Sequence, residues 1–132
     1  MKYFTIAEMS ASATAVSRGI DNIPGPDTVS RLTRLVERVL DPLREAYGKP
    51  ITVNSGYRCP ALNRAVGGAA ASQHLTGEAA DITAGSRQEN SRLYKLLAQL
   101  GLPVDQAINE RGFSWIHVSH TAGHNRGQFL AL

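Results

Sequence analysis

The sequence predicts an α+β fold in which helices come first and most strands follow. Its 132 residues are enough for one domain with a hydrophobic core, and 42% hydrophobic against 19% charged residues is typical of a globular chain. An apolar stripe at helical spacing runs from Val29 to Leu43, whereas the apolar runs after Ile51 are short and bounded by turn residues. No internal repeat or linker is present, so we expect one domain over residues 1–132, with N-terminal helices packed on a mainly antiparallel sheet.

The N-terminal part is expected to be helical. A capping box from Thr5 to Glu8 opens a first helix, which we expect to continue through small residues and to stop near Gly19. Pro26 suits the first turn of a long second helix, whose apolar stripe would face the core. Pro42 is expected to kink or divide that second helix.

The rest of the chain predicts strands and one further amphipathic helix. Turn residues follow the first strand, and a small-residue loop leads into the second. The expected strands cover residues 51–53, 79–83, 105–109 and 114–120, with a possible edge strand at 128–132, and the expected helix covers 90–100.

Composition limits the classes of partner. Lys plus Arg number 14 against 11 for Asp plus Glu, and the net charge of +3 suits an anionic polymer such as a cell wall without requiring one. The basic residues are scattered and aromatic residues are only 6%, so no nucleic-acid partner is expected. Cys59 is the single cysteine, which excludes an internal disulfide and a cysteine-based zinc site.

The N-terminal sequence M-K-Y-F-T-I-A-E-M-S lacks the apolar run of a signal peptide, and no later run reaches membrane-spanning length. We therefore expect no membrane insertion and a protein made in soluble form in the cytoplasm. Action on a cell wall would then need another agent to carry it there.

The segment Ser72–Asp81, S-Q-H-L-T-G-E-A-A-D, holds the most informative pattern. It separates an imidazole, His74, from a carboxylate, Asp81, by seven residues, which is about 10 Å along a continuous helix and too far for one metal ion. A turn at Gly77 would bring them together, since glycine tolerates the backbone angles of a tight reversal. The later run W-I-H-V-S-H adds His117, and two imidazoles with one carboxylate are the composition of a catalytic zinc site with an open position. The alternative is a loop histidine and an ordinary strand histidine.

These motifs resemble a known family. S-x-H-x-x-G-x-A-x-D followed by W-I-H-V is similar to the zinc D-Ala-D-Ala carboxypeptidase family, which includes D-Ala-D-Ala dipeptidases and phage endolysins that cut L-Ala–D-Glu bonds. The segment Ser55–Asn63, S-G-Y-R-C-P-A-L-N, resembles the arginine-bearing motif of that family. The resemblance covers nearly the whole chain, and its N-terminal part is similar to the short phage- and prophage-associated branch. It implies a small α+β fold shared with hedgehog signalling domains.

The resemblance also implies roles for individual residues. His74, Asp81 and His117 match the zinc ligands, and Arg58 matches the arginine that holds the substrate and polarises its scissile carbonyl. A fixed guanidinium suits that role because it donates hydrogen bonds to an oxygen that gains negative charge. The alternative for Arg58 is a structural salt bridge. Ser72 either binds a substrate carboxylate or caps its own loop.

The chain departs from the family pattern at the expected general base. Many relatives carry an acidic residue three positions before the last histidine ligand, where this chain has Ser114. Glu110 is the nearest upstream carboxylate, and the Arg111-Gly112 turn could fold it back over the metal. Glu110 is therefore the candidate catalytic base, with an ordinary surface glutamate as the alternative.

Three further residues are secondary candidates. Trp115 would line the substrate pocket beside the last ligand or belong to the core. His120 and His124 would serve proton transfer or substrate contact, or be ordinary polar positions.

The sequence thus predicts a zinc-dependent peptidase that hydrolyses a peptide bond in the stem peptides of bacterial peptidoglycan. The cut would be that of a D-Ala-D-Ala carboxypeptidase or of an endolysin-type endopeptidase, and the protein is expected to be a monomer that reaches the wall after phage-type release. The alternatives are a non-catalytic, zinc-containing module that binds wall or protein, and a phage structural protein on the same fold.

Overall fold

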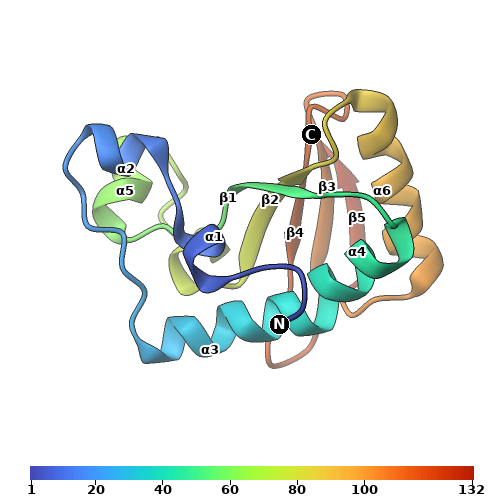
Figure 1. Cartoon of the computed structure of the whole chain (residues 1–132), viewed down its shortest axis with the longest axis horizontal. Helices are drawn as coiled ribbons and strands as arrows, with labels where there is room; N and C mark the ends of the chain where they lie inside the picture. The colour runs from blue at the N-terminus through green and yellow to red at the C-terminus, as the bar shows by residue number, and fades with distance from the viewer.

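Five strands form a single sheet in the order β1-β2-β4-β3-β5 in the computed structural model, which describes residues 1–132 (Figure 1). The pairs β1–β2, β2–β4 and β3–β4 are antiparallel, and β3–β5 is parallel. The predicted α+β fold with a mainly antiparallel sheet is therefore confirmed. The strands are β1 (Thr52–Ser55), β2 (Ala79–Thr83), β3 (Gln106–Glu110), β4 (Trp115–Ser119) and β5 (Gln128–Ala131).

Most of the helical residues precede β2 in the chain, and α6 follows it. Figure 1 shows α3 and α4 running across the sheet and α6 standing beside it. None of the helices has both the length and the apolar character needed to cross a membrane. The helical elements are α1 (Ile6–Ser10), α2 (Ala13–Ser17), α3 (Pro26–Leu35), the π-helical turn η1 (Val36–Leu40), α4 (Asp41–Tyr47), α5 (Pro60–Ala65), the 3-10 turn η2 (Gln73–Thr76) and α6 (Arg87–Leu100).

The prediction of one continuous first helix is wrong, because the segment forms α1 and α2. Thr5 caps α1 as expected, its hydroxyl accepting a hydrogen bond from the Glu8 N–H. The backbone then becomes extended at Ala11, with ψ at 141°. Ser12 starts a new helix, and its hydroxyl accepts from the Ala15 N–H. A serine that can cap its own following turn competes with continuation of the helix.

The long second helix is divided just before Pro42. Its central turn, η1, is π-helical, and the Asp41 N–H donates to the Val36 carbonyl, five residues back. Proline has no N–H and its ring crowds the preceding turn, so a wider turn accommodates it without ending the helix. The helix stops at Gly48, which has a φ of 77°.

Alternation along β4 separates a core face from an open face. Ile116 and Val118 are fully buried and belong to the core cluster that the helices cover. Trp115 and His117 point to the other side and are partly exposed. The fold therefore leaves one face of β4 free for a functional site.

Ile116→Ala should lower the free energy of unfolding by about 2–5 kcal/mol, because it removes fully buried methyl groups and leaves a cavity. Urea unfolding of the two proteins measures the difference. The matched control is Ile23→Ala, since Ile23 is 76% exposed and its truncation should change stability by no more than about 0.5 kcal/mol. Equal losses in both variants would contradict the assignment of Ile116 to the core.

Candidate metal centre

Strand pairing places two of the three predicted ligands side by side. Asp81 of β2 and His117 of β4 are directly opposed in the antiparallel pair. Directly opposed residues point to the same face of a sheet. Oδ1 of Asp81 lies 3.0 Å from Nδ1 of His117.

His74 reaches the same carboxylate from η2, the short turn before β2. Ser72 caps this turn, its hydroxyl accepting a hydrogen bond from the His74 N–H. Gly77 ends the turn with a φ of 81°, and a Cβ there would lie 2.9 Å from a methyl group of Thr28. The reversal expected at Gly77 is therefore present, and it puts Nε2 of His74 3.4 Å from Oδ1 of Asp81.

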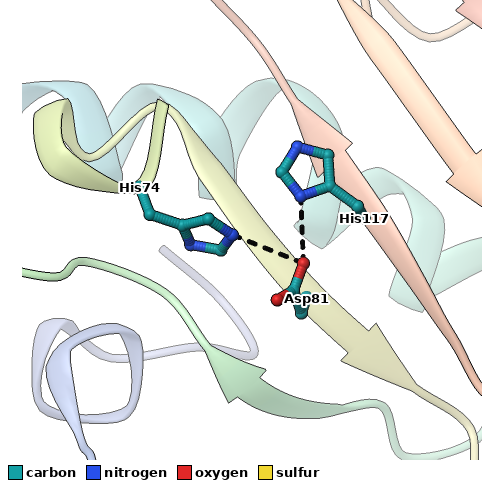
Figure 2. Close-up of side chains that lie close together, drawn as sticks. All are labelled: His74, Asp81 and His117. Atoms are coloured by element: carbon teal, nitrogen blue, oxygen red, sulfur yellow. Dashed lines mark hydrogen bonds and ion pairs between the residues drawn. The ribbon is translucent and has the colours of Figure 1, made fainter. Parts of the chain in front are cut away.

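The three side chains form a donor set that fits a zinc ion. Figure 2 shows them converging from η2, β2 and β4, and their ligand atoms all lie within 4.8 Å of one another. Donors bound to a tetrahedral zinc at about 2.0–2.1 Å are themselves about 3.3 Å apart. The separations of 3.0 Å and 3.4 Å that involve Oδ1 of Asp81 are close to that value. Two imidazoles and one carboxylate also have the chemistry that zinc prefers.

The ring of His74 is fixed by a second contact. Its Nδ1 donates to the Gly56 carbonyl at 2.7 Å, which leaves Nε2 with a free lone pair directed at Asp81. Gly56 itself packs against α1, since a Cβ on it would lie 2.1 Å from the carbonyl oxygen of Met9. Only glycine fits at this position, and the N-terminal helix therefore helps to orient a candidate ligand.

Asp81 is ionised in this environment. Burial opposes the charged form, but the hydrogen bond from His117 opposes burial in turn, and the pKa of Asp81 stays well below its usual value. The candidate donor set thus contains an anionic oxygen at neutral pH.

Arg58 lies at the edge of the cluster. Its Nη2 is 3.8 Å from Oδ2 of Asp81, and its side chain is only 15% exposed. Nε donates to the Ser55 hydroxyl and Nη1 donates to Oδ1 of Asn63. Burial lowers the pKa of Arg58 and the charge of Asp81 opposes that change, but a guanidinium keeps its proton in proteins. The result is a fixed cation beside the candidate ligands.

Asn22 anchors the backbone on both sides of Arg58. Its amide nitrogen donates to the carbonyls of Ser10 and Tyr57, and its oxygen accepts from the Cys59 N–H. The sequence analysis did not identify Asn22. Its position in the D-N-I-P-G turn cluster indicates a loop but gives no sign of which backbone atoms it would bind.

A second unpredicted network holds η2 in place. Asp105 is buried, and both of its oxygens accept hydrogen bonds from the Arg126 guanidinium. Oδ2 of Asp105 also accepts from Nε2 of Gln73, the residue before His74. The hydrogen bonds from Arg126 hold the pKa of Asp105 well below its usual value in spite of desolvation. The ion pair between Asp105, which precedes β3, and Arg126, which follows β4, therefore supports the turn that carries a candidate ligand.

The remaining predicted residues lie around the cluster. Glu110 is opposed to Trp115 across β3 and β4, so both point to the same face as His117. Ser114 is held in the connecting turn, where its hydroxyl donates to the Arg111 carbonyl. The guanidinium of Arg111 lies 5.7 Å from the centre of the Trp115 ring.

Comparison with known proteins gives two matches. The family model described as Peptidase M15 matches residues 2–119. The zinc D-Ala-D-Ala carboxypeptidase of Streptomyces albus G is 41% identical over 87 residues, which are 65% of this chain and 29% of that relative. The match therefore spans less than a third of the length of the relative.

Gly56→Ala should weaken zinc binding about 10- to 100-fold, because the added methyl group pushes away the carbonyl that orients His74. Competition with a chromogenic chelator measures the affinity. Gly123→Ala is the matched control, since a Cβ at Gly123 meets no atom within 4 Å. Unchanged zinc affinity in a folded Gly56→Ala variant would show that this carbonyl does not orient the metal site.

Proposed function

This chain belongs to the Peptidase M15 family, and on that premise we propose that residues 1–132 form a zinc-dependent peptidase domain that hydrolyses a peptide bond in the stem peptides of bacterial peptidoglycan. The observation that carries the proposal is the convergence of His74, Asp81 and His117 beside Arg58. A closed structural zinc site uses four protein ligands, whereas three leave a position for substrate or water.

His74, Asp81 and His117 would hold the zinc ion through Nε2, Oδ1 and Nδ1 respectively. A zinc ion bound there supplies Lewis-acid chemistry, which acidifies water and polarises a carbonyl group. The chain contributes a fixed donor set, because the Gly56 carbonyl and the β2–β4 pairing hold these side chains before the metal binds.

Arg58 binds and orients the scissile carbonyl in this proposal. Its guanidinium is held by Ser55 and Asn63, so little conformational freedom is lost when a substrate oxygen accepts a hydrogen bond from it. Preorganised donors of this kind stabilise the negative charge that develops on a carbonyl oxygen during attack.

Glu110 is the proposed general base. It lies diagonally across the β3–β4 pair from His117, and side chains in that relation are about 7–8 Å apart. This spacing leaves room for a water molecule between the carboxylate and the cluster. The Glu110 carboxylate would take a proton from that water and return it to the nitrogen of the leaving group.

Ser72 and Trp115 are the proposed substrate contacts. The Ser72 hydroxyl accepts from the His74 N–H, so its own hydrogen stays available for a substrate carboxylate. Trp115 is partly exposed on the open face of β4 and would form one wall for the stem peptide.

The name of the Streptomyces relative favours removal of a terminal D-alanine as the reaction. An endopeptidase cut within the stem peptide is the second form of the same proposal. The protein would act on the wall as a monomer. It would reach the wall after being released in the way that phage endolysins are.

A non-catalytic zinc-containing module that binds wall is the alternative, and one observation favours it. Ser114 stands where many relatives have an acidic base, and its hydroxyl is engaged with Arg111 and Arg87. Such a module would bind peptidoglycan without releasing any product.

Glu110→Gln should lower kcat at least about 100-fold, because the amide cannot accept the proton, while the zinc content stays unchanged. Mass spectrometry of products from a stem pentapeptide ending in D-Ala-D-Ala, and from purified peptidoglycan, measures the rate and locates the cut bond. The matched control is Glu78→Gln, since the Glu78 carboxylate accepts a hydrogen bond from the Thr76 hydroxyl and does not belong to the cluster.

The two substrates separate the possible outcomes. D-alanine released from the pentapeptide indicates the carboxypeptidase, and cut stem peptides in peptidoglycan indicate the endopeptidase. A zinc-loaded, folded wild-type protein that binds peptidoglycan but releases nothing from either substrate would establish the non-catalytic module instead.

A further inference from the structure

A polar hollow lies away from the metal cluster. It has a volume of about 230 Å³ and is formed where α3 and η1 pass the loop that follows β4. In Figure 1 that loop passes below α3 at the bottom of the view. By the alternation of β4, His120 falls on the same side as Ile116 and Val118, whereas His117 points to the opposite face. The hollow is therefore on the helix side of the sheet and separate from the proposed active site.

Two arginines without acidic partners line one wall of the hollow. Arg34 and Arg38 are one helical turn apart and exposed, and neither side chain makes an ion pair or a hydrogen bond within the chain. No carboxylate lines the hollow. Glu37 lies on the adjoining surface, where it is 3.6 Å from the amino group of Met1. Like charges one turn apart destabilise a helix, so the pair favours a bound anion.

A buried histidine lines the hollow as well. His120 is only 7% exposed, and its Nδ1 donates to the Pro103 carbonyl at 2.6 Å. Its Nε2 has no hydrogen-bond partner in the chain and is open to solvent, since every buried side-chain nitrogen and oxygen has a partner. The free nitrogen of this ring becomes a donor when the imidazole is protonated.

The loop wall of the hollow is already ordered by its own contacts. The Asn125 side chain accepts from the Thr121 N–H at 2.8 Å and donates to the Thr121 carbonyl at 3.0 Å. The next residue, Arg126, is tied to Asp105. Little ordering of this loop is needed before a ligand binds.

We propose that this hollow binds an oxyanion of the phosphate class through Arg34, Arg38 and His120. Guanidinium groups on the helix wall and an imidazole on the opposite wall line the same hollow. A guanidinium fork binds phosphate oxygens through two parallel hydrogen bonds. Two sources carry this chemistry, namely free phosphate and the phosphodiester of an anionic wall polymer. The site would be additional to the proposed peptidase activity and does not depend on it.

A second basic hollow in the same protein serves as an internal comparison. It has a volume of about 310 Å³, and Arg92 and Lys95 of α6 line it. Arg92 is 3.2 Å from Glu89, and no histidine lines this hollow. Both hollows therefore have cationic side chains on a helix. Only the hollow beside His120 has unpaired arginines and a buried imidazole.

The test is a titration of the zinc-loaded protein with inorganic phosphate and with bis-glycerol phosphodiester, followed by the imidazole nitrogen signals of His120 in NMR. We expect a saturable shift at His120 that the Arg34→Gln/Arg38→Gln variant weakens about tenfold or more, since each lost charge-assisted hydrogen bond costs about that factor. Arg92→Gln/Lys95→Gln removes the same charge from the other hollow and should change the affinity less than about twofold.

The phosphodiester separates the two sources. Saturation by both probes indicates a wall-polymer site, and saturation by phosphate alone indicates a site for the free anion; both support the hollow as an oxyanion site. Phosphate bound at the metal would shift His117 and survive the Arg34→Gln/Arg38→Gln change. The absence of a saturable shift at His120, or equal weakening in the two double variants, would overturn the proposal.

Discussion

The register of β2 against β4 is the constraint on which the candidate site depends. It opposes Asp81 to His117 and, one strand further, Ile108 to His117. A slip of one residue would turn His117 into the core and bring Val118 to the open face. The fully buried neighbours Ile116 and Val118 prevent such a slip, because exposing them would cost the hydrophobic free energy of the core. Core packing and site geometry are therefore fixed by the same alternation.

The elements around this pair act on it through backbone contacts. The η2 turn brings His74 to Asp81, and the Arg58 N–H donates to the His74 carbonyl. The Gly56 carbonyl then fixes the ring of His74. Segments far apart in the sequence thus hold each other in place, which is the preorganisation that a metal site with an open position requires.

Local patterns predicted much of this arrangement. The strand at 79–83, the reversal at Gly77 and the long helix divided near Pro42 follow from turn chemistry and side-chain periodicity, both of which are local properties. The break between α1 and α2 was missed because a capping serine and a helix-interior serine look alike in sequence. Asn22, the Asp105–Arg126 pair and the hollow beside His120 depend on long-range contacts that no local pattern specifies. The roles of Glu110 and Ser72 remain predictions.

Zinc content tests the central claim most directly. Elemental analysis of untagged wild type, His74→Ala and His124→Ala should find about one zinc per chain in the wild type, none in His74→Ala, and an unchanged amount in the control His124→Ala. His124 is an exposed loop residue outside the cluster. No zinc in the folded wild type after incubation with the metal, or equal zinc in all three proteins, would contradict the assignment of His74, Asp81 and His117 as its ligands.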